Sequence, residues 1–155
     1  MDSPDKARAW FRIGYNCAQS VMCAFSGSLG IDERTIKLMA SGFGGGMGRE
    51  QLTCGAVAGA VMAVGCRWFD PDDVPASKER VYAKTREVLK RFRELHGSVS
   101  CRELLGVDLN TPEGKKQARE QDLFRVRCEP FVMDACRIVE EMIAEESSAP
   151  AKPQA

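Results

Sequence analysis

A stretch of small residues in the first half of the chain constrains the fold more than any other feature. Five glycines lie within seven residues, 42–48, where a regular helix would be costly because glycine loses the most backbone entropy on ordering. A run of small apolar residues then begins at Cys54, and Gly55, Gly59 and Ala63 recur along it every four residues. On a helix this spacing forms one smooth stripe, against which a neighbouring backbone can pack closely. The stretch predicts a glycine loop followed by a helix buried at the centre of a bundle.

Helical spacing of apolar residues continues through the rest of the chain, and no alternating strand pattern or internal repeat is present. Four polar residues are placed to cap helices: Asp32, Ser77, Ser100 and Thr111. The first helix is expected to start at Pro4 and to run on until Gly27 ends it. We therefore predict an all-α protein, a compact bundle of about five to six helices around the small-residue central helix. Residues 1–146 are expected to form one domain, and residues 147–155 a disordered C-terminal tail.

Composition narrows the class of function. The 155 residues include 22 Lys and Arg and 22 Asp and Glu, so a net charge of zero argues against binding to nucleic acid or an anionic membrane surface. The longest apolar run, residues 54–66, is shorter than the roughly 20 residues that a membrane span needs. The N-terminal segment lacks the apolar region of a secretory signal. We expect a cytoplasmic protein with no membrane insertion.

Seven cysteines are unusual in a chain of this kind. In a reducing compartment such enrichment is typical of metal binding or redox chemistry, because structural disulfides are rare there. The number is odd, so the cysteines cannot all pair within one chain. Every spacing is at least six residues, which argues against a zinc finger, a thioredoxin-like site and a ferredoxin-like loop. Any shared site must therefore be assembled from distant parts of the chain.

The cysteines differ in local context. Three fall at predicted helix N-termini, where backbone N–H groups and the helix dipole favour the thiolate and lower its pKa: Cys54, Cys101 and Cys128. Cys17 follows Asn16 on an apolar face beside Gly14. The remaining three are expected to pack as small hydrophobes: Cys23, Cys66 and Cys136. Burial is the ordinary explanation for any one cysteine, but three at helix starts favour a common site.

Two other features of the sequence, the single histidine and the glycine loop, do not indicate a catalytic or nucleotide-binding site. His96 is the only histidine and is expected to pack near a helix C-terminus, which excludes a His-rich metal site and a Ser/His/Asp triad. The glycine loop has Met47 where a dinucleotide-binding G-x-G-x-x-G motif needs its third glycine, and no strand precedes it. It is interpreted as flexible backbone beside a ligand or thiol site rather than as a nucleotide loop.

Four segments together resemble a known family. They are Y-N-C-A-Q-S-V, G-F-G-G-G-M-G followed by T-C-G-A-V-A-G, S-C-R-E-L-L-G-V-D, and R-C-E-P-F-V. Their order is similar to the redox-active family labelled C_GCAxxG_C_C, which is described by four cysteines and a C-G-A-x-x-G motif. The resemblance covers nearly all of the chain except the tail and implies that the site residues are Cys17, Cys54, Cys101 and Cys128. Members are also similar to the helical, cluster-bearing part of split-Soret cytochromes, although this chain has no C-x-x-C-H haem attachment site.

The resemblance implies a redox role but leaves the reaction open. The four thiolates could hold an iron–sulfur cluster, most simply a [2Fe–2S], that carries single electrons to a redox partner protein. Alternatively, Cys54 could attack a partner's disulfide and a second cysteine resolve it. A third interpretation is a structural Cys₄ zinc site in a helical binding module. We favour the cluster because four ligands from four segments would tie the bundle to one point, and assembly into a homodimer stays open.

Overall fold

The computed structural model describes residues 1–149 and confirms the all-α prediction. It is 76% helical, with ten α-helices and no strands in the part of the chain described. The elements follow in this order: α1 (Ser3–Arg12), α2 (Cys17–Ala24), α3 (Ser26–Leu29), α4 (Glu33–Met39), η1 (Ser41–Phe43), α5 (Gly44–Met47), α6 (Gly55–Trp68), α7 (Val74–His96), α8 (Cys101–Leu105), α9 (Pro112–Glu120), η2 (Phe124–Cys128) and α10 (Glu129–Ser148). None of these helices is both long and apolar enough to cross a membrane.

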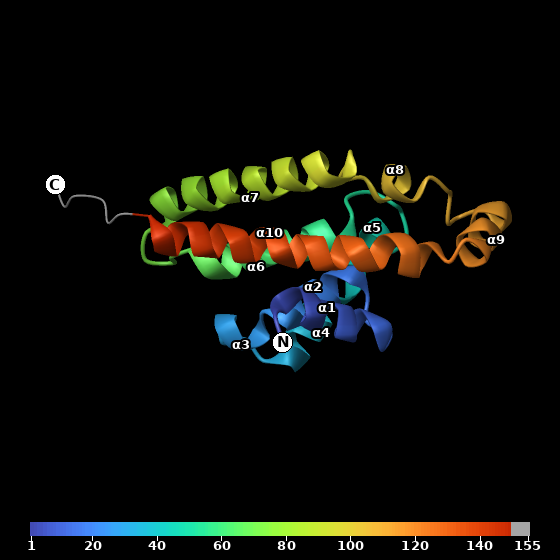
Figure 1. The fold of residues 1–155 in the computed structure, drawn as a ribbon. Coiled ribbons are helices and arrows are strands. Elements are labelled where there is room, and N and C mark those ends of the chain that lie inside the picture. Colours follow the sequence, from blue (N-terminus) through green and yellow to red (C-terminus); the bar gives the residue numbers. More distant parts are fainter. Residues whose placement is uncertain (150–155) are drawn as a thin grey trace.

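The helices form two groups around α6. The long helices α7 and α10 run beside one another and both contact α6, while α1 to α4 gather on another side of α10 and α6 (Figure 1). The short helix α8 follows the end of α7 and lies near α5, and α9 lies beyond the end of α10 (Figure 1). This end of the bundle is built from short elements and loops, and it is where the chain's irregular backbone is concentrated.

The small-residue stripe of α6 packs against α2, as predicted. A Cβ atom on Gly59 would lie 2.8 Å from Cβ of Val21 and 3.0 Å from the carbonyl oxygen of Ala18. A Cβ on Gly55 would lie 3.2 Å from Cβ of Cys17. Such distances are below ordinary van der Waals contact, so both glycines of the C-G-A-x-x-G motif are needed for the close approach of the two helices. The motif therefore has a packing role as well as any chemical one.

The prediction of one long first helix was wrong. The chain forms α1, α2 and α3 instead, because Gly14 adopts φ +106° and turns the backbone between the first two. Asn16 then begins a new helix: its side chain accepts a hydrogen bond from the Gln19 amide, and the Gln19 side chain accepts one from the Asn16 amide. This reciprocal capping box fixes Cys17 as the first residue of α2. The apolar periodicity alone did not reveal the interruption.

The last helix is slightly longer than expected. α10 continues through Ser148, two residues beyond the predicted end of the domain at residue 146. The first residues of the predicted tail are thus helical, while the rest of that prediction, from residue 150 on, lies outside the described residues.

Candidate functional site: a four-cysteine cavity

One cavity of about 590 Å³ lies at the irregular end of the bundle. Four cysteines from separate segments line it: Cys17, Cys54, Cys101 and Cys128. The other three cysteines are not among the lining residues: Cys23, Cys66 and Cys136. Cys23 and Cys136 are buried as expected, whereas Cys66 is exposed, so its predicted role as a packed core residue was wrong. The structure therefore brings together the four positions that the sequence had singled out, in a volume within the range of ligand-binding sites.

Three of the cavity cysteines stand at the beginning of a helix: Cys54 precedes α6, Cys101 is the first residue of α8, and Cys17 is the first residue of α2. The predicted helix start at Cys128 was wrong, because Cys128 ends η2 and helical backbone continues through it into α10. The sequence reasoning had missed the helix start at Cys17. The signal was present as Asn16 followed three residues later by Gln19, the pattern of a capping box.

A short antiparallel bridge holds two of the cysteines together across a long sequence separation. The amide of Cys54 donates a hydrogen bond of 2.7 Å to the carbonyl of Val99, and the amide of Cys101 donates one of 2.7 Å to the carbonyl of Leu52. Backbone hydrogen bonds of this kind fix the main chain on both sides of each cysteine. The separation between the two side chains is thus set by main-chain pairing rather than by side-chain packing.

The glycine loop forms a left-handed turn against the cavity. Residues 45–49 all have φ between +56° and +68°, including Met47 and Arg49, and a non-glycine residue in this region is strained by about 1–2 kcal/mol. The turn is hydrogen-bonded, for example from the Leu52 amide to the Gly46 carbonyl at 2.9 Å. A Cβ on Gly46 would come within 2.7 Å of Cβ of Cys101. The loop does lie beside the thiol site as expected, and its glycines allow it to approach a cysteine directly.

Gln51 is a site residue that the sequence reasoning did not find. Its side chain is only 3% exposed, and its two polar atoms are both used: Nε2 donates to the Val107 carbonyl at 2.9 Å and Oε1 accepts from the Leu109 amide at 2.8 Å. Leu109 lines the cavity. A buried amide with both ends paired is a rigid tie, and here it joins the left-handed turn to the loop that follows α8. Nothing in its local sequence marks it as buried.

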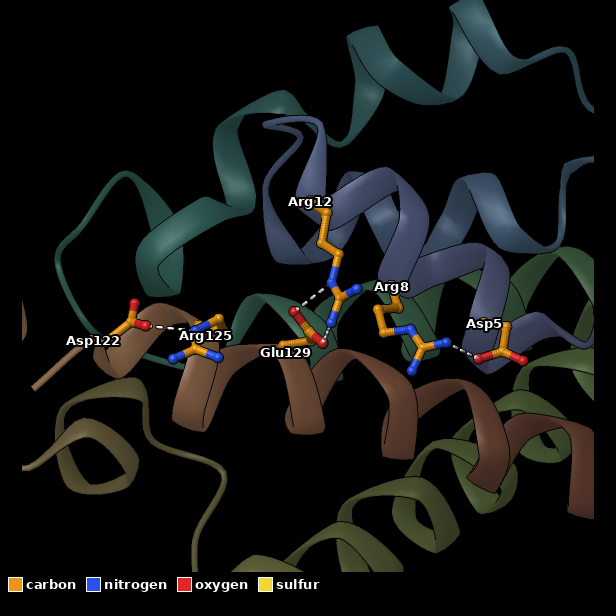
Figure 2. A network of polar contacts seen from close by, with 6 residues as sticks. All are labelled: Asp5, Arg8, Arg12, Asp122, Arg125 and Glu129. Atoms are coloured by element: carbon orange, nitrogen blue, oxygen red, sulfur yellow. Dashed lines mark hydrogen bonds and ion pairs between the residues drawn. The ribbon is translucent and has the colours of Figure 1, made fainter.

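Cys128 is positioned by a π-helical turn and an ion pair. In η2 the Glu129 amide donates to the Phe124 carbonyl, five residues earlier, a widened turn that is frequent at functional sites. Glu129 is buried and accepts two hydrogen bonds from Arg12, of 2.7 and 3.1 Å (Figure 2). This bidentate pair fixes the start of α10 against the end of α1, and with it the cysteine one residue before.

The pKa values of the cavity thiols differ from the expectation that helix starts would lower them. Burial first, and neighbouring cysteines of the cavity second, raise the pKa of Cys54 and of Cys101 from 9.0 to about 12. The Cys17 pKa is raised well above 9.0, first by hydrogen bonding with the Cys128 thiol and then by burial. Desolvation thus outweighs the helix N-terminus for Cys54 and Cys101, and the neighbouring Cys128 thiol and burial together do so for Cys17. At neutral pH the free protein holds them as neutral thiols.

The four cysteines line the cavity without forming a preorganised metal site. Within residues 1–149 no group of three or more His, Cys, Asp or Glu side chains is placed to hold a metal ion. The walls between the cysteines are mainly apolar side chains: Phe11, Leu104, Leu105, Leu109, Phe124 and Phe131. Soft thiol donors in an apolar surround are compatible with a bound metal group.

His96 lies outside the cavity, as expected for a packed histidine. Its ring lies between those of Phe92 and Phe131, with centroids 4.7 and 4.8 Å away. Its Nε2 is 3.1 Å from Oδ2 of Asp134 but without the geometry of a hydrogen bond. His96 and Asp134 therefore make a polar contact between α7 and α10, and His96 is not placed to bind a group in the cavity.

Comparisons with known proteins identify the class of this helical, four-cysteine protein. Residues 15–142 match the family described as "Putative redox-active protein (C_GCAxxG_C_C)". The chain belongs to this family, and all four cavity cysteines fall inside the matched region. A protein of Archaeoglobus fulgidus, described only as an uncharacterized protein, is 32% identical over 114 residues, which cover 68% of this chain and 76% of the relative. No solved structure matches the chain.

Proposed function

We propose that the cavity binds an iron–sulfur cluster through Cys17, Cys54, Cys101 and Cys128, and that the protein transfers single electrons to and from a redox partner protein. The observation that carries the proposal is the convergence of four sulfurs from four segments on one cavity of about 590 Å³. Membership of a family described as redox-active supports the same class of function.

The cavity fits a cluster better than it fits a single zinc ion. A tetrahedral zinc site needs four sulfurs about 2.3 Å from one point, and the cavity of about 590 Å³ is far larger than such a site. A cluster spreads its four thiolate ligands around a larger body. The difference favours a polynuclear group over a structural zinc site, which stays the alternative.

The residues of the chain would do three things at this site. The cysteine sulfurs would bind iron as thiolates, so that loading releases the thiol protons. The antiparallel bridge and Gln51 would hold Cys54 and Cys101 at a fixed separation. Leu104, Leu105 and Phe131 would limit access of water, which matters because the solvent exposure of a cluster tunes its reduction potential. The bound group would supply one-electron chemistry.

Thiol–disulfide exchange is a second candidate, favoured by the proximity of two cavity cysteines. Hydrogen bonding with Cys128 is the largest cause that raises the pKa of Cys17, which places the two thiols near one another. In the second candidate these two would form a disulfide while a partner's disulfide is reduced to two thiols. Neither Cys17 nor Cys54 offers much attacking thiolate at neutral pH, because the pKa of Cys17 is raised well above 9.0 and that of Cys54 to about 12.

The test is the complete set of seven single Cys→Ser variants, purified without oxygen. Iron, sulfide and zinc are measured in each, together with visible absorption and the positions of any disulfide. We expect iron and sulfide in the wild type, and their loss or strong reduction in the four cavity variants, because serine is a poorer ligand for iron. The variants at Cys23, Cys66 and Cys136 serve as matched controls and should keep the chromophore.

Other outcomes separate the alternatives. Metal-free protein with a disulfide between Cys17 and Cys128 would support exchange, and one zinc per chain would support a structural site. If the seven variants behave alike, the cavity cysteines have no common function and the proposal fails.

A further inference from the structure

The cavity has one charged side chain on its wall. Apart from the cysteines, its lining consists of apolar residues, glycines and a few uncharged polar groups, and Arg49 is the single exception. Within residues 1–149 the Arg49 guanidinium makes no ion pair. Most other arginines near this end are paired, such as Arg12 with Glu129 and Arg125 with Asp122 (Figure 2).

The backbone around Arg49 is strongly constrained. Its φ is +67°, a left-handed conformation that is strained for a residue with a side chain. Its amide donates to the Gly44 carbonyl at 3.2 Å, and its carbonyl accepts from Nδ2 of Asn110 at 2.9 Å. Two hydrogen bonds thus fix the backbone of Arg49 in this conformation, although the residue itself is exposed to solvent.

The absence of a side chain at Gly45 makes room for the stem of Arg49. A Cβ on Gly45 would lie 2.7 Å from Cγ of Arg49 and 3.3 Å from its Cβ. Both residues line the cavity. The left-handed turn therefore places an unpaired cation along the cavity wall, on the segment that also contacts Cys101 through Gly46.

We infer that Arg49 is the counter-charge for an anionic group held in the cavity. The inference rests on the proposed function, because iron ligated by four thiolates and sulfide carries net negative charge. A cation on a partly apolar wall stabilises such a group, and it stabilises the reduced form more because reduction adds a further negative charge. Arg49 thus raises the reduction potential of the bound group through its charge and does not ligate the iron.

The first arm of the test needs no cluster. Metal-free, reduced protein is alkylated with iodoacetate, which is an anion, and separately with iodoacetamide, which is neutral, and modification of the four cavity cysteines is followed by peptide mass spectrometry. We expect the ratio of the iodoacetate rate to the iodoacetamide rate to fall several-fold in Arg49→Gln, because the anion is no longer attracted to the cavity. Arg49→Lys should keep the ratio, and Arg86→Gln, on the exposed surface of α7, should leave it unchanged.

The second arm uses protein purified without oxygen. The reduction potential should become more negative in Arg49→Gln and should change much less in Arg49→Lys and Arg86→Gln. A fall in the alkylation ratio without any bound iron would uphold the role of Arg49 and overturn the cluster proposal. Equal ratios in wild type and Arg49→Gln, cavity cysteines that resist both reagents, or a cluster whose potential ignores Arg49 would overturn this inference.

Discussion

The cavity and the interior of the helical bundle both contain buried cysteines, and the two sets differ in their neighbours. Cys54 and Cys136 are each less than 10% exposed, and burial is the main cause that raises the pKa of both thiols. Around Cys136 the neighbours belong to the packed core, and its thiol lies 4.0 Å from the Val21 carbonyl. Around Cys54 the neighbours include other cysteines and open space.

This difference shows that burial and protonation do not identify a functional cysteine here. Cys54 and Cys136 are both neutral thiols at neutral pH, so the pKa of the side chain does not separate a cavity cysteine from a core cysteine. What separates them is convergence on one cavity and the irregular backbone that produces it. The interior is regular helix on regular helix, whereas the cavity is framed by a left-handed turn, a π-helical turn and an antiparallel bridge.

The largest effect on stability is expected from overpacking the interior of the helical bundle. In Gly59→Leu the new side chain would collide with Val21 and with the Ala18 backbone on α2. We expect a loss of about 3 kcal/mol in the free energy of unfolding, at the upper end of the cost of overpacking. Urea denaturation measures it.

The matched control for Gly59 lies on the same helix. A Cβ on Gly65 would have no atom within 4 Å, so Gly65→Ala should stabilise the protein by about 0.5–1 kcal/mol through its better helix propensity. If Gly59→Leu is as stable as the wild type, α6 does not pack closely on α2 at this position.

An intermediate effect is expected from the ionisation of the thiols, measured on metal-free, reduced protein. Between pH 9 and about 12 the Cys54 thiol of the unfolded chain loses its proton while that of the folded chain keeps it. Unfolding then releases protons, so the stability that is complete below pH 9 is lost as the pH rises. Each such thiol contributes at most about 1.4 kcal/mol per pH unit to this slope.

Cys54→Ser and Cys136→Ser should therefore flatten the alkaline loss of stability to a similar degree, because both pKa values are raised by burial. Cys66→Ser is the control and should change the slope least, since that thiol is exposed. Urea denaturation at a series of pH values checks this. A slope altered by the cavity variant alone would mean that protonation does distinguish the two regions.

The smallest effect is expected at the strained turn of the cavity. Met47 has φ +68° and is about half exposed, so Met47→Gly should relieve backbone strain, offset in part by the larger entropy of the unfolded chain. We expect a net stabilisation of about 0.5 kcal/mol. Met47→Leu keeps the strain and should match the wild type. A glycine variant less stable than the leucine variant would show that the turn is not strained.

Much of the fold follows from local sequence. The caps at Asp32, Ser100 and Thr111 and the stop at Gly97 begin and end helices where the pattern predicts them, because capping depends on atoms within one turn. The predicted cap at Ser77 was wrong: α7 begins at Val74 after Asp73, whose side chain accepts from the Ala76 amide, and Ser77 lies inside the helix. The helix break before Cys17 was equally local, but the apolar periodicity on both sides of it concealed the signal.

The features of the site likewise divide into those that follow from local sequence and those that depend on tertiary structure. The sequence by itself set four cysteines apart from the other three, through the local context of Cys54, Cys101 and Cys128 and the family resemblance of all four. Only the tertiary structure decided that Cys17, Cys54 and Cys101 keep their protons, because burial and neighbouring thiols depend on what the whole chain packs around each sulfur. It also decided that Gln51 ties the turn to the loop after α8 and that Arg49 lies unpaired on the cavity wall. Both depend on contacts between segments far apart in the sequence, which no local pattern encodes.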